Sequence, residues 1–351
     1  MSDNSPARHA LADLTTLGLG GPAGRLVTAE SADGIVSAVH AAARSAEPLL
    51  VLGGGSNVVI GDVGFPGTVL LVRSSGVEVV GEHGDAVSLR VAAGHPWDDC
   101  VARTVADGLS GIECLSGIPG ASGSTPIQNV GAYGQDVSQT IEAVTVYDRT
   151  EGETVVFSPA DCRFEYRNSV FKYTDRWVVL DVTFRLRRDP LSGPVGHAEL
   201  ARLLGVGENG RVPLADVRAA VLELRRGKGM VLDPGDPDTD SVGSFFTNPV
   251  LSAAAYAELS RRFDGVEPPA WPGVDGVMKV SAAWLIERAG FERGYARGPV
   301  AISSKHILAL THRGGGTTGE LLELATEIRD RVHERFGVTL RPEPVLVGCE
   351  L

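Results

Sequence analysis

The spacing of apolar residues predicts helices in several stretches of the chain. From Ser31 to Glu47 apolar side chains recur at helical spacing, and Ser31 is a suitable N-cap. Residues 214–225 show the same spacing and carry their apolar side chains on one face. Further helices are predicted at residues 97–107, 253–263, 281–289 and 319–336.

Short apolar runs and alternating patterns predict strands between these helices. Residues 77–93 alternate about a His-Gly-Asp turn and predict a hairpin, as do residues 143–157 about Thr150-Glu151-Gly152. Residues 177–186 predict a long strand. Shorter strands are predicted at residues 48–51, 58–60, 68–72, 301–303 and 307–311. The pattern indicates a mixed α+β fold in two or three units, with a candidate boundary in the Asp-, Gly- and Pro-rich residues 227–240.

Composition narrows the function classes. The chain has 351 residues, with 44 glycines and 20 prolines that follow no period, which excludes a collagen-like protein. A net charge of −12 argues against nucleic acid or an anionic membrane as partner. No apolar run reaches the roughly 18 residues of a membrane helix, and residues 1–10 carry no secretory signal. Scattered cysteines and histidines predict no metal site, and we expect a cytoplasmic protein.

A glycine-rich loop follows the strand predicted at residues 48–51. It consists of Gly53, Gly54, Gly55, Ser56 and Asn57. Successive glycines let backbone N–H groups converge on an anion, and the two polar side chains add hydrogen-bond donors. The loop is neither a P-loop nor a Rossmann fingerprint, since the required lysine and third glycine are missing. A tight turn between strands and a phosphate-binding loop both fit this pattern.

A second, longer glycine-rich loop spans residues 115–136. Its length favours a functional loop over an ordinary connector. Its glycines permit close approach to a flat or phosphorylated ligand, and Tyr133 offers an apolar face. A flexible linker is the alternative, and apolar residues such as Ile127 and Val130 argue against it. Two such loops together predict a large polyphosphate ligand such as a dinucleotide.

Three further side chains suit recognition of a carboxylate or transfer of a proton. Arg167 lies in an aromatic segment, residues 164–172, and has a planar guanidinium that can bind a carboxylate through two hydrogen bonds. Ser244 follows a glycine and precedes two phenylalanines, and a serine flanked by Arg and Glu can protonate a carbanion. Glu343 lies between two prolines that restrict its backbone. Taken singly, each residue also fits a solvated surface position or a turn.

Taken together and in this order, these segments resemble the UDP-N-acetylenolpyruvoylglucosamine reductase family, the MurB flavoenzymes of peptidoglycan synthesis. The similarity extends from about residue 14 to residue 348. The matching segments are residues 53–57, 117–134, 166–172, 243–246 and 342–343. One such segment has little weight, but five in the family's order form a specific signal.

The resemblance implies an α+β fold: an FAD-binding fold of the vanillyl-alcohol-oxidase (PCMH) type in two domains, plus a third α+β substrate-binding domain. The FAD-binding domains would comprise residues 1–75 with 340–351, and residues 76–228. The C-terminal substrate-binding domain would comprise residues 229–339. In the family the last segment returns to the first domain, which would bring Glu343 towards the flavin.

The resemblance also implies a two-stage hydride transfer with FAD as cofactor and NADPH as co-substrate. NADPH would reduce FAD, and the flavin would then deliver hydride to the β-carbon of UDP-N-acetylglucosamine enolpyruvate, giving UDP-N-acetylmuramate. Ser244 would protonate the α-carbon, while Arg167 and Glu343 hold the substrate carboxylate and stabilise the enolate. The implied cofactor-binding residues are Gly53, Gly54, Gly55, Ser56, Asn57, Gly117, Ile118, Pro119, Gly120, Ser124, Gly131, Ala132 and Tyr133.

Four residues are implied in substrate binding. Asn248 matches a nucleotide-binding position, and Lys228 or Lys279 would neutralise the diphosphate. His197 stands where the substrate-covering loop of the family commonly presents a tyrosine, so we expect activity with altered substrate affinity. The expected protein is a monomer.

Two rival functions fit the same segments. One is another flavin oxidoreductase of the same superfamily that acts on a different sugar or alcohol. Arg167, Ser244 and Glu343 argue against it, because alcohol oxidation calls for a base. The other is a non-catalytic flavin- or UDP-sugar-binding regulator, which would be expected to lack one of these three residues.

Overall fold

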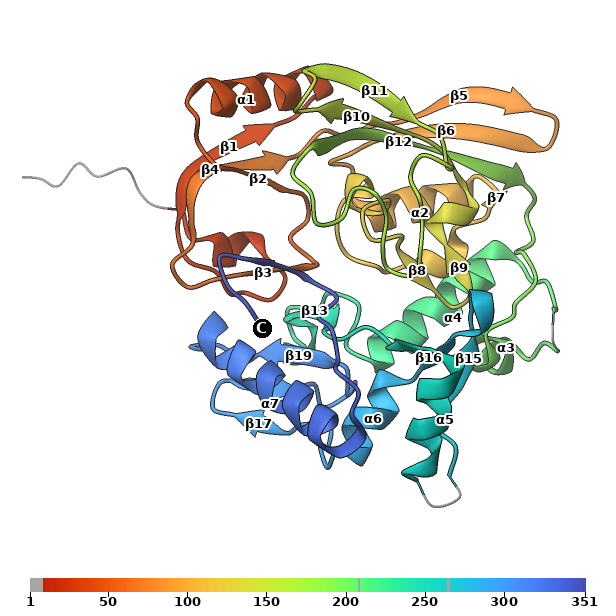
Figure 1. Cartoon of the computed structure of the whole chain (residues 1–351). Coiled ribbons are helices and arrows are strands. Elements are labelled where there is room, and N and C mark those ends of the chain that lie inside the picture. Colours follow the sequence, from red (N-terminus) through yellow and green to blue (C-terminus); the bar gives the residue numbers. More distant parts are fainter. Residues whose placement is uncertain (1–8, 208, 264–265) are drawn as a thin grey trace, which may run out of the picture. The chain divides into compact units, whose positions relative to one another are not determined.

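The computed structural model describes residues 9–207, 209–263 and 266–351. Most of the segment used to judge a secretory signal, residues 1–8, lies outside the described residues. The chain forms two compact units, whose elements are labelled in Figure 1. Of the described residues, unit 1 contains 9, 23–55 and 65–232, and unit 2 contains 10–22, 56–64 and the rest from 233 onward. The first glycine-rich loop therefore begins in unit 1 and ends in unit 2.

A small parallel sheet and one helix carry the first glycine-rich loop. Strands β1 (Ala23–Ala29), β4 (Phe65–Val72) and β2 (Leu49–Leu52) lie in the order β1-β4-β2. Helix α1 (Ala32–Arg44) follows β1, and the side chain of its N-cap Ser31 accepts a hydrogen bond from the backbone of Gly34 at 3.1 Å. This confirms the predicted helix and its cap. The loop begins directly after β2.

A larger antiparallel sheet forms the rest of the unit 1 framework. Its strands lie in the order β11-β10-β12-β6-β5, and β7 pairs with β12. Their bounds are β5 Val77–His83, β6 Ala86–Ala92, β7 Leu109–Ser110, β10 Ile141–Asp148, β11 Glu153–Phe157 and β12 Trp177–Arg188. Both predicted hairpins and the predicted long strand are confirmed.

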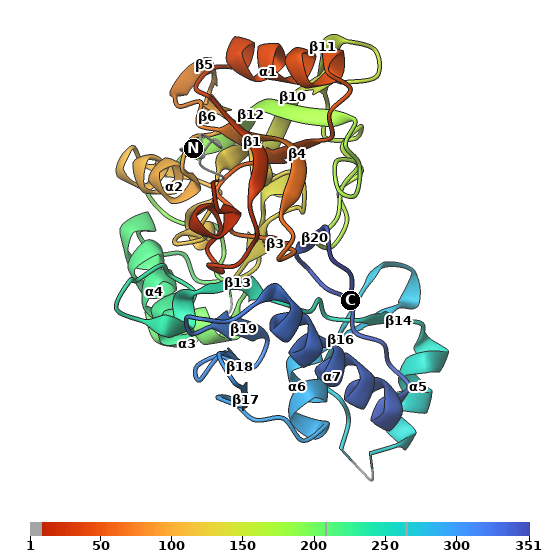
Figure 2. The same cartoon turned by 90° about the vertical axis from the view of Figure 1, so that its left-hand side faces the viewer.

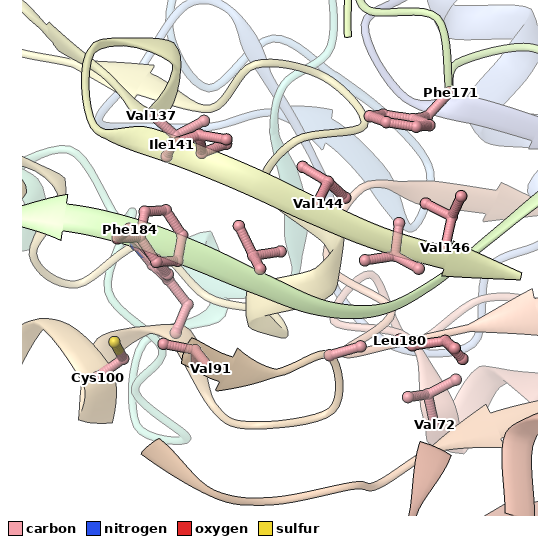
Figure 3. Close-up of a cluster of buried hydrophobic side chains, with 14 of the residues drawn as sticks. Val72, Val91, Cys100, Val137, Ile141, Val144, Val146, Phe171, Leu180 and Phe184 are labelled. Atoms are coloured by element: carbon pink, nitrogen blue, oxygen red, sulfur yellow. The ribbon is translucent and has the colours of Figure 1, made fainter. Parts of the chain in front are cut away.

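The apolar face of this sheet packs with helix α2 (Trp97–Ala106) in the unit 1 core. Figure 3 shows side chains from β6, β10, β12 and α2, among them Val91, Val144, Phe184 and Cys100, in one cluster. Two more helices of unit 1, α3 (Ala198–Leu204) and α4 (Leu214–Gly227), share a smaller buried cluster. Helix α4 was predicted from its spacing, whereas the short helix α3 was not.

The second glycine-rich loop contains only brief regular elements. These are a 3-10 turn at Ser122–Ser124 and the paired two-residue strands β8 (Gly131–Ala132) and β9 (Gln135–Asp136). Single 3-10 turns lie at Leu11–Leu14, Glu113–Leu115, Val137–Gln139, Pro237–Thr239 and Val274–Gly276. The loop thus gains its shape from specific contacts rather than from repeating backbone hydrogen bonds.

In its described residues, unit 2 is built from short strands and three α-helices around its own core. One sheet has the order β13-β19-β18-β17 and another the order β14-β16-β15. The strands are β13 Ser241–Ser244, β14 Val250–Leu251, β15 Ala270–Pro272, β16 Met278–Val280, β17 Ala296–Arg297, β18 Val300–Ile302 and β19 Ala309–His312. The helices are α5 Ala253–Arg261, α6 Ala282–Arg288 and α7 Thr318–Phe336. A capping box between Thr317 and Glu320 begins α7.

The last strand of the chain returns to the segment that follows the first glycine-rich loop. Strand β20 (Val345–Val347) pairs in parallel with β3 (Val58–Ile60), as Figure 2 shows. The backbone of Val345 also donates to the carbonyl of Asn57 at 3.1 Å. The predicted division into three domains, with limits at residues 75, 228 and 339, stays a prediction. Among the described residues, no helix combines the length and the apolar character needed to cross a bilayer.

Candidate active site

The two glycine-rich loops lie against each other within unit 1. A Cβ placed on Gly54 would lie 2.5 Å from the Cα of Gly120, and one on Gly53 would lie 2.8 Å from Oγ of Ser124. Any side chain at Gly54 would therefore push the two backbones apart. Gly55 has a φ of 67°, which also favours glycine. The tight-turn interpretation of the first loop accounts for its conformation but not for this loop-to-loop contact.

Hydrogen bonds from unit 1 fix the second loop in place. Its Gly120 carbonyl accepts from the backbone of Trp97 at 3.0 Å, and its Gly117 N–H donates to Oδ1 of Asp98 at 2.5 Å. Ser122 Oγ donates to the carbonyl of His95 at 3.0 Å. Apolar residues of the loop, including Ile118, Ile127 and Val130, pack against the unit 1 core. These contacts exclude the flexible-linker alternative.

Tyr133 occupies a strained position in the second loop. Its φ is 51°, in the left-handed region that side chains other than glycine rarely adopt. Burial raises the pKa of its hydroxyl. Its ring contacts the ring of His197 with 5.0 Å between centroids, and Nζ of Lys228 lies 5.7 Å from its centroid. Three of the predicted ligand-binding residues thus lie together in unit 1.

Two polar atoms beside this group are buried without a hydrogen-bond partner among the described residues. They are Nδ1 of His197 and Nε of Arg225. Burial lowers the pKa of the His197 imidazole, and it lowers the pKa of Arg225 to about 10. Buried polar atoms normally find partners, so these two mark a place where a ligand or water can bind. Lys228 is itself paired with Glu199, with 2.6 Å between Nζ and Oε2.

Arg225 is a candidate ligand-binding residue that the sequence pattern did not predict. Its position in the sequence could have indicated it, because it lies four residues after Val221 and eight after Val217, on the apolar face of α4. A cation in an otherwise apolar helical stripe is uncommon, and only 8% of Arg225 is exposed.

Arg167 is held by the second glycine-rich loop. Its Nη2 donates to the carbonyl of Gly131 at 2.6 Å, and its Nη1 donates to the carbonyl of Asn129 at 3.3 Å. Nη1 also lies 3.7 Å from Oδ1 of Asp136. Arg167 has a φ of 55°, and the buried Lys172 donates to its carbonyl at 3.1 Å. Although Glu165 and Tyr166 of this segment are exposed, its two cations are held by the protein and are not solvated surface charges.

Gly131 is required by this arrangement. A Cβ at this position would lie 1.6 Å from Oδ1 of Asp136 and 3.0 Å from Nη1 of Arg167. The glycine therefore leaves room for the ion pair. Whether it also contacts a cofactor, as predicted for Gly131 and Ala132, stays a prediction.

Ser244 stands at the end of a bulged strand in unit 2. In the pairing of β13 with β19, Ser241 is opposite Thr311 and Ser244 is opposite Ala309, with an irregularity between them. Gly243 takes a φ of 74° at this bulge. A bulge redirects the side chain that follows it, here Ser244. The next two residues, Phe245 and Phe246, are almost completely buried, with their ring centroids 5.1 Å apart.

The chain segment around Glu343 lies beside the Ser244 turn. The backbone of Glu343 donates to the carbonyl of Phe245 at 2.8 Å. Phe246 and Pro342 form an isolated antiparallel bridge. Ser244 and Glu343, which are far apart in sequence, are therefore brought together within unit 2. Arg167 belongs to unit 1.

The remaining predicted residues have structural contacts of their own. Oδ1 of Asn248 accepts from the backbone of Ala282 at 2.9 Å and so helps to begin α6. Lys279 lies in β16, with Nζ 5.7 Å from the ring centroid of Trp271. Their predicted contacts with substrate stay predictions.

His306 is a second residue that the sequence interpretation missed. Its Nε2 lies 3.3 Å from Oγ of Ser244. It follows β18 in a turn that carries no recognised motif, so nothing in the sequence singled it out.

The cysteines and acidic residues of the described chain form no metal site. No group of three or more His, Cys, Asp or Glu side chains there is suited to bind a metal ion. All four cysteines are free, and burial raises the pKa of Cys100, Cys114 and Cys162 to about 12. Such thiols are poor nucleophiles.

The fold and the two glycine-rich loops indicate the general class of protein. Residues 23–158 match the model of an FAD binding domain. The loops fit such a cofactor, because they meet at glycines, and glycine-rich backbone can approach a pyrophosphate closely. The chain is thus a flavoprotein oxidoreductase with an α+β fold.

The particular family follows from the second half of the chain and from whole-chain relatives. Residues 236–347 match the C-terminal domain of UDP-N-acetylenolpyruvoylglucosamine reductase. Proteins of that name from Salinispora arenicola and Thermobifida fusca are 62% and 59% identical to this chain. The two alignments cover 100% and 97% of this chain, and 98% and 97% of the respective relatives. The chain belongs to the UDP-N-acetylenolpyruvoylglucosamine reductase family.

A solved structure agrees with this assignment. The crystal structure of UDP-N-acetylenolpyruvylglucosamine reductase (MurB) from Thermus caldophilus is similar to this chain with a TM-score of 0.67 and 25% identity. The match covers 97% of this chain and 98% of the other. The predicted family, the FAD-binding α+β fold and the enzyme class are thereby confirmed, while the roles of individual site residues stay predictions.

Proposed function

We propose that this chain reduces the enolpyruvyl group of UDP-N-acetylglucosamine enolpyruvate to the lactyl ether, with FAD as cofactor and NADPH as co-substrate. The observation that carries the proposal is the pairing of the Ser244 turn with the Glu343 segment, through the 2.8 Å hydrogen bond between Glu343 and Phe245. It supports the proposal because it brings the chain segments of Ser244 and Glu343 together within unit 2 of a family member. The product, UDP-N-acetylmuramate, would enter peptidoglycan synthesis and so support cell-wall growth, cell shape and cell division.

FAD would be held by the facing glycine-rich loops. The contact of Gly54 with Gly120 supports a pyrophosphate position at this junction, with Ser56, Asn57 and Ser124 as polar neighbours. When bound there, FAD would supply hydride transfer from NADPH to the β-carbon of the substrate. Tyr133, half-buried in the second loop, would offer its ring to the cofactor.

Protonation at the α-carbon falls to Ser244. Its O–H bond breaks as the new C–H bond forms with the electron pair of the enolate. Arg167 and Glu343 would hold the substrate carboxyl group, and the Arg167 guanidinium would stabilise the negative charge that develops on the enolate. Arg167 belongs to unit 1 and the other two to unit 2, so their joint action is part of the proposal.

The uridine diphosphate would be bound by Lys228 or Lys279, together with Asn248, with His197 in place of the tyrosine common in the family. The buried unpaired Nδ1 of His197 and its contact with Tyr133 support a ligand beside it. A few placed cations suffice to attract a diphosphate to a chain whose net charge is −12. We place the enzyme in the cytoplasm as a monomer, with neither nucleic acid nor membrane as a partner.

Stopped-flow measurement of the two half-reactions tests this function. NADPH should bleach the flavin absorbance near ~450 nm, and the sugar nucleotide should restore it. Ser244→Ala should leave the first step nearly intact and slow the second by about 10²- to 10⁴-fold. Ser260→Ala, which removes a buried hydroxyl in α5, is the matched control and should slow neither step.

Two results would contradict the proposal. Equal loss in both steps of Ser244→Ala would remove Ser244 from its role. NADPH oxidation that does not depend on the sugar nucleotide would favour the rival oxidoreductase, and a purified protein without flavin would favour neither flavin function.

A further inference from the structure

The hydroxyl of Ser244 has a neighbour on the adjacent strand connection. Nε2 of His306 lies 3.3 Å from Oγ of Ser244. The β13–β19 pairing places Ser244 opposite Ala309, and the backbone of Phe245 donates to the carbonyl of Leu308 at 2.7 Å. The histidine precedes these partner residues in the same turn. Backbone pairing between residues 244–245 and residues 308–309 therefore keeps the His306 turn next to Ser244.

Hydrogen bonds within the turn that carries His306 fix its backbone. Oγ of Ser303, which is fully buried, accepts from the backbone of Lys305 at 3.0 Å and from that of His306 at 3.1 Å. The carbonyl of His306 accepts from Ala309 at 3.1 Å, and Ser303 donates to the carbonyl of Ala309 at 2.8 Å. The backbone of His306 is thus bonded on both its donor and its acceptor side.

The same turn is tied to the loop that precedes β13. Oδ1 of Asp238 accepts from the backbone of Ser304 at 3.0 Å, and its Oδ2 accepts from Oγ of Ser304 at 2.5 Å. Nζ of Lys305 lies 2.5 Å from Oδ2 of Asp236. Only 4% of Asp238 is exposed, so its two hydrogen bonds with Ser304 are shielded from solvent. These hydrogen bonds, together with the burial of Ile307 in the unit 2 core, hold the turn that presents His306.

We propose that His306 is a positioning residue for Ser244, with Nε2–H donating to Oγ. This inference rests on the proposed function. A hydroxyl has one hydrogen and two lone pairs, so a donor on Oγ leaves the hydroxyl hydrogen directed elsewhere, toward the α-carbon. When that proton leaves, the electron pair stays on Oγ, where the same N–H stabilises the alkoxide until a solvent proton restores the hydroxyl.

Kinetics of the half-reactions in His306→Ala, measured on the full-length holoenzyme, test the proposal. Reduction by NADPH should be unchanged, and reoxidation by the sugar nucleotide should slow by about 10²-fold, the usual cost of a misplaced catalytic group. The Michaelis constant of the sugar nucleotide should change little. His306→Gln, which keeps an N–H donor, should restore most of the rate. If His306→Ala folds poorly, His306→Leu replaces it, since leucine fills space without a donor.

A double-mutant cycle separates positioning of Ser244 from a general effect on unit 2. In a Ser244→Ala background, His306→Ala should cause no further loss. His312→Gln is the control, because Nε2 of His312 accepts from Gly316 at 3.0 Å in the same sheet. Persistence of the His306 effect without Ser244, failure of glutamine to restore the rate, or equal slowing of both half-reactions would overturn the inference. If the parent enzyme does not reduce the sugar nucleotide, the proposed function itself fails.

Discussion

Arg167 in unit 1 and Ser244 in unit 2 both lie where the backbone departs from regular structure. The residue with the unusual backbone conformation differs between the two sites. Arg167 itself has a φ of 55°, and polar contacts with the carbonyls of Gly131 and Asn129 hold its side chain. At Ser244 the positive φ belongs to the preceding Gly243, and the following Phe245 is buried. Arg167 therefore has the positive φ itself, whereas beside Ser244 a glycine has it.

This difference has consequences for substitution. Changes at Arg167 or its polar partners should alter side-chain geometry while the unit 1 core stays intact. Changes beside Ser244 should reach the unit 2 core, because the turn is part of that core. Function is therefore expected to be lost without unfolding when Arg167 is changed, and together with stability when the buried residues next to Ser244 are changed.

Phe245→Ala should have the largest effect. Truncating a fully buried phenylalanine typically lowers the free energy of unfolding by about 3–5 kcal/mol, and Phe245 is 0% exposed. Thiol labelling during urea titration identifies the unit that opens, because Cys349 belongs to unit 2 and Cys100, Cys114 and Cys162 to unit 1. We expect Cys349 to become reactive at lower urea.

Phe171→Ala is the matched control in unit 1. Phe171 is 3% exposed and belongs to the unit 1 core, so its truncation should expose the three buried thiols first. If both variants exposed all four cysteines together, the two units would unfold as one and the comparison would lose its energetic basis.

Arg167→Lys should have the next largest effect, on activity alone. Lysine keeps the charge but lacks the planar fork that reaches two carbonyls and a carboxylate. Loss of a positioned donor commonly slows catalysis by about 10²- to 10³-fold. We expect this loss in flavin reoxidation by the sugar nucleotide, with the urea midpoint near that of the parent. A marked fall in that midpoint would show that the polar contacts of Arg167 serve the fold.

Gly131→Ala should disturb the contact between Arg167 and Asp136 by displacing the carboxylate. The new Cβ would meet Oδ1 of Asp136, whose side chain is 46% exposed and free to move outward. Arg167 would then lose its ion pair, and we expect reoxidation to slow by about tenfold, as for one weakened polar contact. Combining Gly131→Ala with Asp136→Ala removes the clash and should slow the enzyme no further. A further large loss in the double variant would point to a backbone effect instead.

The sequence pattern predicted the scaffold better than the site. Helix α1 with its Ser31 cap and the long strand β12 follow from local spacing, which side chains within one element determine. The short helix α3 was missed, since seven residues offer too little periodicity. Family resemblance supplied Ser244 and Glu343, but their proximity arises from pairing between distant segments, which no local pattern encodes.

The missed residues have two different causes. Arg225 was visible in principle, as a cation on the apolar face of α4. His306 was not, because its relation to Ser244 depends on the bulge in β13 and on the register of β19. Tertiary register determines such contacts, and a single sequence does not report it.

Substitution of His197 has the smallest predicted effect and tests the group that His197 forms with Tyr133 and Lys228 in unit 1. Burial lowers the pKa of its imidazole below the ordinary value near 6.5, while Glu199 raises it and Lys228 lowers it. The unfolded chain therefore binds more protons at this residue, and its contribution makes unit 1 less stable as pH falls below about 6.5. Burial lowers the pKa of His95 as well, so part of this dependence should survive in any His197 variant.

His197→Tyr should weaken the loss of stability between pH 7 and pH 5, because the buried titrating ring and its unpaired Nδ1 disappear. The larger ring should also change the Michaelis constant of the sugar nucleotide by less than about tenfold, the range of one aromatic contact. Urea midpoints at the two pH values and steady-state kinetics measure both effects. His95→Gln is the control, since it should weaken the pH dependence without changing the Michaelis constant. An unchanged Michaelis constant in His197→Tyr would contradict the proposed role of His197 in substrate binding, and an unchanged pH dependence would mean that its protonation is not linked to folding.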